Sequence, residues 1–183
     1  MRLRAWLAMR RTLRVCGFLS LIFAGLLLFG LHLRYTTPDW PKAFQFGSLL
    51  MAAAMTSFAL AASVTAELAV SSVAENEIEP AVRWLAIGIS CWLVFLFLEI
   101  VEWVRLLFLV DLGPKTPFGF SHFLTTGFHW IAVLAGVGWL TWSVSDVRRR
   151  NPLSAALFSH FLSVWWLVIS VVLYFTNAGL SGF

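Results

Sequence analysis

Long uncharged stretches, separated by short charged segments, dominate the chain. Five such intervals run through residues 15–33, 43–66, 84–98, 116–145 and 151–183. A helix needs about 20 apolar residues to cross a bilayer core of about 30 Å. Four intervals meet that length, and the third meets it if it continues through Glu99 and Glu102 to Val110. Backbone groups inside lipid must bond within their own segment, so the pattern predicts helices rather than barrel strands.

We therefore expect an all-α integral membrane protein, a bundle of five transmembrane helices that forms a single membrane domain over residues 1–183. The expected helices are 13–33, 44–72, 81–110, 118–144 and 153–177. The arginine-rich start of the chain offers an alternative, in which the first helix is a signal peptide. Its apolar run is longer than usual for a signal peptide, and residues 31–34 offer no small-residue cleavage site, so we expect it to be retained.

Composition and charge fit this class. The chain is 60% hydrophobic and 12% charged, which excludes a soluble domain or a disordered tail. With the N-terminus in the cytoplasm, the cytoplasmic segments hold nine Lys and Arg residues and the outer segments four. Basic residues collect on the cytoplasmic side, so we expect a cytoplasmic N-terminus and a periplasmic C-terminus. The same asymmetry accounts for the net charge of +4 without a nucleic-acid partner.

Tryptophans and small residues indicate how the helices are placed. Indoles anchor at the lipid headgroups, and five lie near expected helix ends: Trp40, Trp84, Trp103, Trp139 and Trp142. The second helix is rich in Ala, Ser and Thr, which let membrane helices approach closely. We expect this helix to be central. The first and fifth helices carry long Leu, Phe, Val and Trp faces, and we expect them to be more exposed to lipid.

Ionisable side chains inside the membrane are costly and usually paired or functional. Glu99, Glu102 and Arg105 follow one another at three-residue spacing on one face of the third helix. They form either a polar patch that holds a lipid headgroup, a proton or a neighbouring subunit, or the end of a helix that reaches outer water. His129 and His160 lie deep in the last two helices, and His122 precedes His129 by seven residues. Each is more often a hydrogen-bonded packing residue than a metal ligand.

Recognisable catalytic chemistry is absent from the sequence. It has no phosphate-binding glycine loop, no Gly-x-Ser-x-Gly and no His-Glu-x-x-His, and Cys16 and Cys91 lack a metal-binding or disulfide spacing. We therefore expect no catalytic, cofactor-binding or metal-binding residue. Two alternatives stay open at this point. One is a membrane cytochrome b with haem ligated by His129 and His160, and the other is a small proton- or solute-conducting protein that uses Glu99 and Glu102.

Three segments carry motifs in a fixed order. Residues 98–103 hold Glu99 and Glu102, residues 126–129 read Thr-Gly-Phe-His before an apolar run, and residues 159–166 contain His160 and Trp166. Together they resemble the signatures of subunit III of haem-copper terminal oxidases, the cytochrome c or quinol oxidase subunit III family, in its short five-helix form. The chain departs from that family's pattern in several places. Ala132 and Ser163 replace a usual His and Asp, Ala53-Ala54 replaces a serine pair, and the first helix lacks a carboxylate.

The resemblance implies a non-redox accessory subunit of a respiratory oxidase in a prokaryotic plasma membrane. Such a subunit packs against catalytic subunit I, lies in one complex with subunit II, binds phospholipid in a helix cleft and supports proton uptake and stability. The haems and copper belong to the partner subunits. The resemblance implies that the polar residues contacting lipid or partner subunits are Glu99, Glu102, Arg105, His129, His160 and Trp166.

Overall fold

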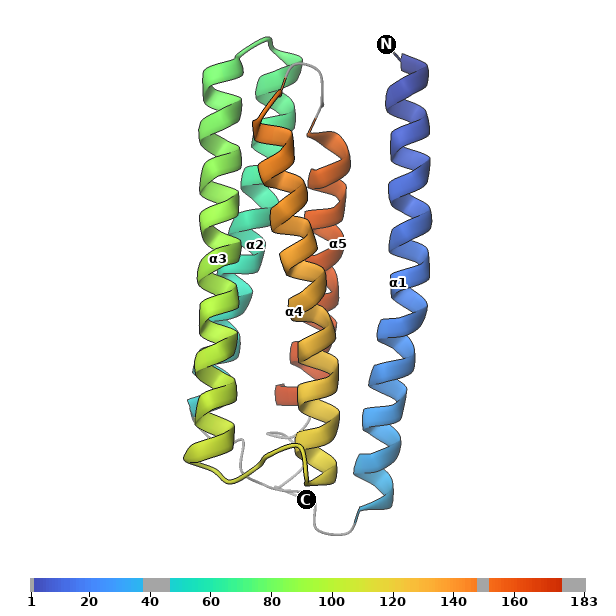
Figure 1. The fold of residues 1–183 in the computed structure, drawn as a ribbon, viewed down its shortest axis with the longest axis vertical. Coiled ribbons are helices and arrows are strands. Elements are labelled where there is room, and N and C mark those ends of the chain that lie inside the picture. Colours follow the sequence, from blue (N-terminus) through green and yellow to red (C-terminus); the bar gives the residue numbers. More distant parts are fainter. Residues whose placement is uncertain (1, 38–46, 148–151, 176–183) are drawn as a thin grey trace.

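Five long helices account for nearly all of the chain that the structure describes. The computed structural model describes residues 2–37, 47–147 and 152–175 (Figure 1). Its helices are α1 (Arg2–Thr36), α2 (Gly47–Ala74), α3 (Ile78–Phe108), α4 (Pro117–Val144) and α5 (Leu153–Ser170), and α5 continues into the π-helical turn η1 (Val171–Phe175). These ranges contain no β-strand. All five helices are long and apolar enough to cross a membrane, which confirms the expected fold class.

Helix α1 begins earlier than the sequence pattern predicts. We expected it to start near residue 13, but it starts at Arg2 and includes the arginine-rich segment. Arg, Leu, Met and Ala all have high helix propensity, so the charged segment continues the helix although it is too polar for lipid. The apolar pattern reports where a membrane helix enters lipid, and the backbone helix extends beyond that point.

Four of the helices form a ring, and the fifth packs on its outside. Around the ring, α2 contacts α3, α3 contacts α4, α4 contacts α5 and α5 contacts α2. Helix α1 lies against α4 and α5 (Figure 1). The connections after α2 and α3 are short, and short connections in bundles join antiparallel neighbours. Thr116 caps the start of α4 by accepting a hydrogen bond of 3.0 Å from the Gly119 backbone N–H.

The prediction that α5 is exposed to lipid is wrong, whereas α2 is contacted by both α3 and α5. Helix α5 contacts α1, α2 and α4, and half of its most apolar span is buried. Helix α1 is the exposed one, with 17% of its span buried, as we expected. In lipid, a face of large apolar residues suits either lipid or another helix, because no hydrophobic force distinguishes the two. Large residues on α5 therefore gave no information about its surroundings.

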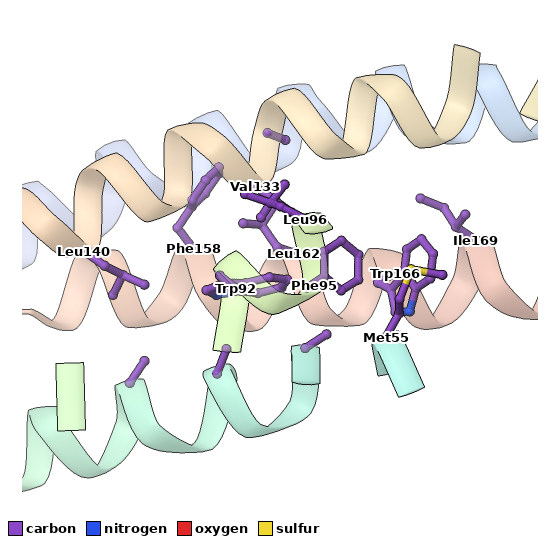
Figure 2. Close-up of a cluster of buried hydrophobic side chains, with 14 of the residues drawn as sticks. Met55, Trp92, Phe95, Leu96, Val133, Leu140, Phe158, Leu162, Trp166 and Ile169 are labelled. Carbon is purple, nitrogen blue, oxygen red and sulfur yellow. The ribbon is translucent and has the colours of Figure 1, made fainter. Parts of the chain in front are cut away.

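Aromatic rings from α3 and α5 fill the middle of the ring of helices (Figure 2). Phe95 meets Trp166 edge-to-face at a centroid distance of 4.8 Å, and Trp92 meets Phe95 at 5.4 Å. Offset and perpendicular contacts of this kind are the favourable ones between rings. Met55 of α2 and Leu162 of α5 are fully buried beside them. This layer fixes the depth at which the polar side chains of the neighbouring turns lie.

Small residues of α2 are used in contact with α3. A β-carbon on Gly88 of α3 would lie 2.8 Å from the Thr65 hydroxyl and 3.4 Å from the Ala62 carbonyl oxygen. The absence of a side chain at Gly88 therefore lets these two helices approach closely. The alanines, serines and threonines of α2 predict close packing correctly, and α2 uses them against both α3 and α5.

The expected orientation depends in part on residues outside the described ranges. Trp40, Lys42 and residues 148–150 lie there. In Figure 1, α1 begins at the end of the bundle where α2 passes into α3, and α5 finishes at the opposite end. A cytoplasmic N-terminus and a periplasmic C-terminus remain predictions.

Candidate functional site: buried polar residues of the bundle

An ion pair lies near the end of α3. The Arg105 guanidinium donates from Nε to Oε2 of Glu102 at 2.8 Å and from a terminal nitrogen to Oε1 at 2.9 Å. The Glu102 side chain is 1% exposed and that of Arg105 is 23% exposed. Two parallel bonds between a guanidinium and a carboxylate are the strong, orienting form of this interaction. Their three-residue spacing on one helix makes the pair possible.

Glu99 lies one turn earlier on the same face of α3 and is also buried, with 1% exposure. Its carboxylate interacts with the Thr126 hydroxyl of α4. The Thr126 oxygen accepts a hydrogen bond of 2.9 Å from Trp103 Nε1 and donates one of 3.0 Å to the His122 carbonyl. Among the described residues, Oε2 of Glu99 has no hydrogen-bond partner. The predicted face of α3 therefore points into the protein, toward α4.

Two more buried residues complete this group. The ring centroids of His122 in α4 and Tyr174 in η1 are 5.8 Å apart and nearly perpendicular. Tyr174 also interacts electrostatically with Glu99, Glu102 and Arg105. We call these residues the α3–α4 polar cluster: Glu99, Glu102, Arg105, His122, Thr126 and Tyr174. Sequence reasoning placed Tyr174 within the fifth helix but did not single it out, since no motif or charged neighbour in the sequence marks it.

His129 lies in the aromatic layer, away from that cluster's charges. Its side chain is fully buried, with ring centroids 5.8 Å from Phe23, 5.5 Å from Phe95 and 5.4 Å from Trp166. The ring donates from Nε2 to the Leu162 carbonyl of α5 at 3.1 Å. Among the described residues, Nδ1 has no hydrogen-bond partner. His129 thus joins α4 to α5 as a packing residue with one interhelical hydrogen bond.

Polar side chains of α5 bond across to α2 and α3. Trp166 Nε1 donates to the Thr56 hydroxyl at 3.1 Å, and the Ser163 hydroxyl donates to the Ala59 carbonyl at 2.7 Å. The Ser159 hydroxyl accepts from Trp92 Nε1 at 2.9 Å. Ser163 stands where the resemblance leads one to expect an aspartate, and its neutral hydroxyl is satisfied by the α2 backbone without a buried charge.

His160 occupies a different position, on the surface where α5 meets α2. Its Nε2 lies 3.2 Å from Oε2 of Glu67, and its Nδ1 is hydrogen-bonded to the Ser63 hydroxyl. The side chains of His160 and Glu67 are 39% and 56% exposed. Sequence reasoning treated Glu67 only as the charged boundary of an apolar interval, so its pairing with a residue 93 positions away was missed.

His129 and His160 do not fit paired axial ligation of a haem. Axial ligands must direct a ring nitrogen at the same iron from opposite sides. Nε2 of His129 is bonded to Leu162 within a packed aromatic layer, whereas both ring nitrogens of His160 are bonded to α2. Within residues 2–37, 47–147 and 152–175, no group of three His, Cys, Asp or Glu side chains is placed to bind a metal.

The six predicted contact residues thus fall into three groups. The fold brings Glu99, Glu102 and Arg105 together in the α3–α4 polar cluster, and it brings His129 and Trp166 together in the aromatic layer. His160 stands apart with Glu67. The buried groups connect helices through hydrogen bonds, and the bidentate ion pair lies within α3. Chemically, this arrangement suits holding helices and neighbouring molecules in place.

Comparison with known proteins gives relatives over most of the chain. Cytochrome c oxidase subunit 3 of Alkalihalophilus pseudofirmus is 27% identical over 169 residues, which cover 87% of this chain and 82% of that protein. Cytochrome c oxidase subunit 3 of Corynebacterium diphtheriae is 28% identical over 148 residues, 75% of this chain and 71% of that protein. Cytochrome bo(3) ubiquinol oxidase subunit 3 of Pseudomonas aeruginosa is 28% identical over 132 residues, 67% and 63% of the two chains. No family model matches the chain. The relatives confirm the resemblance drawn from the three motifs.

Proposed function

Because this chain is related to oxidase subunit 3 proteins over most of its length, we propose that it is the accessory subunit III of a respiratory haem-copper oxidase. It packs against catalytic subunit I, with subunit II in the same complex, in a prokaryotic plasma membrane. The relatives carry this proposal, and the five apolar helices agree with it as a multi-pass membrane subunit. The haems and copper reside in the partner subunits, where oxygen is reduced.

Two of the six contact residues have exposed surface. Arg105 and His160 are partly exposed, whereas Glu99, Glu102, His129 and Trp166 are almost completely buried. Exposed groups reach lipid headgroups or partner chains directly. Buried groups act by fixing the relative positions of the helices that form the contact surface. The proposal therefore assigns direct contact to Arg105 and His160, and a positioning role to the other four.

Phospholipid binding has a candidate location between α2 and α3. An apolar groove of about 280 Å³ is lined there by Phe58, Ala86, Ile87, Ser90, Cys91 and Val94. A lipid acyl chain is the apolar occupant that a bilayer supplies to such a groove. Binding of an ordered lipid between the helices stabilises the folded subunit, because a ligand that binds only the folded state shifts the equilibrium toward it. We propose that this stabilisation supports the proton uptake and lifetime of the oxidase.

Affinity purification of the tagged full-length chain from its native membranes tests the proposed function. We expect it to co-purify with subunits that show a haem absorption spectrum and bound copper. Deleting the gene for this chain should leave an oxidase that loses activity sooner during turnover. Recovery of the chain without any haem-containing partner would contradict the proposal, as would a haem spectrum from the isolated chain that disappears in His129→Ala.

A further inference from the structure

An acid and an imidazole meet on the outer surface of the bundle, within two membrane-spanning helices. Glu67 of α2 accepts a hydrogen bond from His160 of α5, and Ser63 of α2 bonds the second ring nitrogen. The spans that contain them are Leu49–Ala74 and Leu153–Tyr174. We call Ser63, Glu67 and His160 the α2–α5 polar patch. It differs from the α3–α4 polar cluster in being roughly half exposed.

Both members of the pair lie well inside their helices. Glu67 precedes the end of α2 at Ala74 by seven residues, and His160 follows the start of α5 at Leu153 by seven residues. At a rise of about 1.5 Å per residue, each lies roughly 10 Å from the end of its helix. Ionisable groups within membrane spans almost always face protein or a water-filled cavity. Here half of the pair's surface faces outward instead.

The Glu67 carboxylate has hydrogen-bonding capacity left on its exposed side. A carboxylate offers about four acceptor positions, and His160 supplies one donor at 3.2 Å. A donor on a neighbouring molecule would use this remaining capacity, and a charged group left unsatisfied in lipid is costly. Charge complementarity therefore predicts an occupant that presents a hydrogen-bond donor or a positive charge at this depth.

The surface around Glu67 lets another helix approach closely at some positions. The exposed α2 positions that share its face, at spacings of three and four residues, combine small residues with larger ones: Ala53, Ser57 and Ser71 with Leu60 and Val64. The exposed face of α1 instead carries large apolar side chains: Leu13, Phe18, Leu21, Leu28 and Phe29. Small residues allow a second backbone to approach closely, which the large side chains of α1 do not.

From these observations we propose that the α2–α5 polar patch is the docking site of a transmembrane helix from a partner subunit. That helix presents a basic or amide side chain to the exposed oxygen of Glu67. His160 holds the carboxylate in position, and Ser63 fixes the ring. The proposal rests on the proposed function, since it requires a partner subunit in the same complex, and it assigns the contact to a particular face of this chain.

Substitution of Glu67 by leucine distinguishes between two possible occupants of the patch, a partner helix and lipid. If a donor of a partner helix contacts Glu67, Glu67→Leu leaves that donor unpaired, and recovery of partner subunits with the tagged chain falls by about tenfold or more. If only lipid covers the patch, removing a carboxylate from the membrane leaves recovery equal or higher. The matched control is Glu79→Leu, since Glu79 is 77% exposed and pairs with Arg83 near the start of α3. The tagged Glu79→Leu chain should recover as much of the partner subunits as the wild-type chain does.

Photo-crosslinking in the purified complex gives a second, independent measurement. A photoreactive residue at Val64, which is 58% exposed and one turn from Glu67, should form an adduct with a partner subunit. The control places the same photoreactive residue at position 21 of α1, where Leu21 is 75% exposed. It measures how often such a residue forms adducts with lipid. Adducts of Val64 with phospholipid alone would overturn the inference.

The two proposals fail in different ways. If the wild-type chain purifies without haem-containing subunits, the proposed function fails. If the wild-type chain purifies with them and Glu67→Leu does so equally well, the proposed function stands and the docking site is overturned.

Discussion

At the scale of single residues, the ion pair between Glu102 and Arg105 holds a buried carboxylate by two hydrogen bonds. Glu102 is almost fully buried, and both of its oxygens accept from one guanidinium. Removing one partner of a buried pair leaves an uncompensated charge, which costs more than the pair itself contributes. The two members should therefore behave very differently when they are removed singly and together.

Arg105→Leu is expected to lower the stability of the chain by about 3 kcal/mol, because the buried Glu102 carboxylate loses the guanidinium that donates to both of its oxygens. The midpoint of unfolding in detergent measures this loss. The double variant Glu102→Gln/Arg105→Leu should recover most of it. Arg83→Leu is the control, since Arg83 belongs to an exposed pair with Glu79, and its effect should stay below about 1 kcal/mol. Equal losses for Arg83→Leu and Arg105→Leu would contradict this account.

His129 is a packing residue in this account, so a substitution of similar shape should be tolerated. His129→Leu keeps the aromatic layer filled and removes one hydrogen bond to the Leu162 carbonyl. We expect a loss of about 1 kcal/mol, measured by the same unfolding midpoint, with an unchanged haem spectrum of the purified complex. A haem spectrum altered by this variant would show that His129 does more than pack.

At the scale of helices, close approach between α2 and α3 depends on the absence of a side chain at Gly88. A methyl group there would meet the Thr65 hydroxyl and the Ala62 carbonyl. We expect Gly88→Ala to destabilise the bundle by about 1–3 kcal/mol through overpacking. Gly25 of α1 has open space around its α-carbon, so Gly25→Ala should be neutral or stabilising by up to about 1 kcal/mol. Thermal unfolding of the two variants in detergent compares them directly, and a neutral Gly88→Ala would remove the argument for close α2–α3 packing.

At the scale of the whole molecule, an odd number of spans places the two ends of the described chain on opposite sides of the membrane. The basic residues predict that the α2–α3 turn is cytoplasmic and that the α3–α4 connection is periplasmic. Cysteine at Glu75 or at Lys115, both exposed, tests this with a membrane-impermeant maleimide. In intact cells we expect labelling of Lys115→Cys, and of Glu75→Cys only after the membrane is opened. The reverse labelling pattern would show that the orientation is opposite to the one predicted.

Much of the architecture follows from local sequence, but the site follows from it only in part. The number of helices was predictable because four apolar intervals have the length of a membrane span, and the third reaches it when it continues through Glu99 and Glu102. The face shared by Glu99, Glu102 and Arg105 was predictable because helical spacing fixes it. The pairing of His160 with Glu67 was not, since nothing local relates residues on two helices separated by 93 positions. The position of α5 was misjudged, because lipid and a neighbouring helix are equally apolar.

The sequence by itself therefore determined that five apolar segments cross a membrane as helices and which charged residues they carry into it. Length and composition are properties of one segment, and lipid permits few other backbone arrangements. Only the tertiary structure decided which polar groups are satisfied inside the bundle and which remain at its surface. That depends on how the helices are rotated about their axes and on which neighbours they meet, and these are set by packing contacts between distant segments.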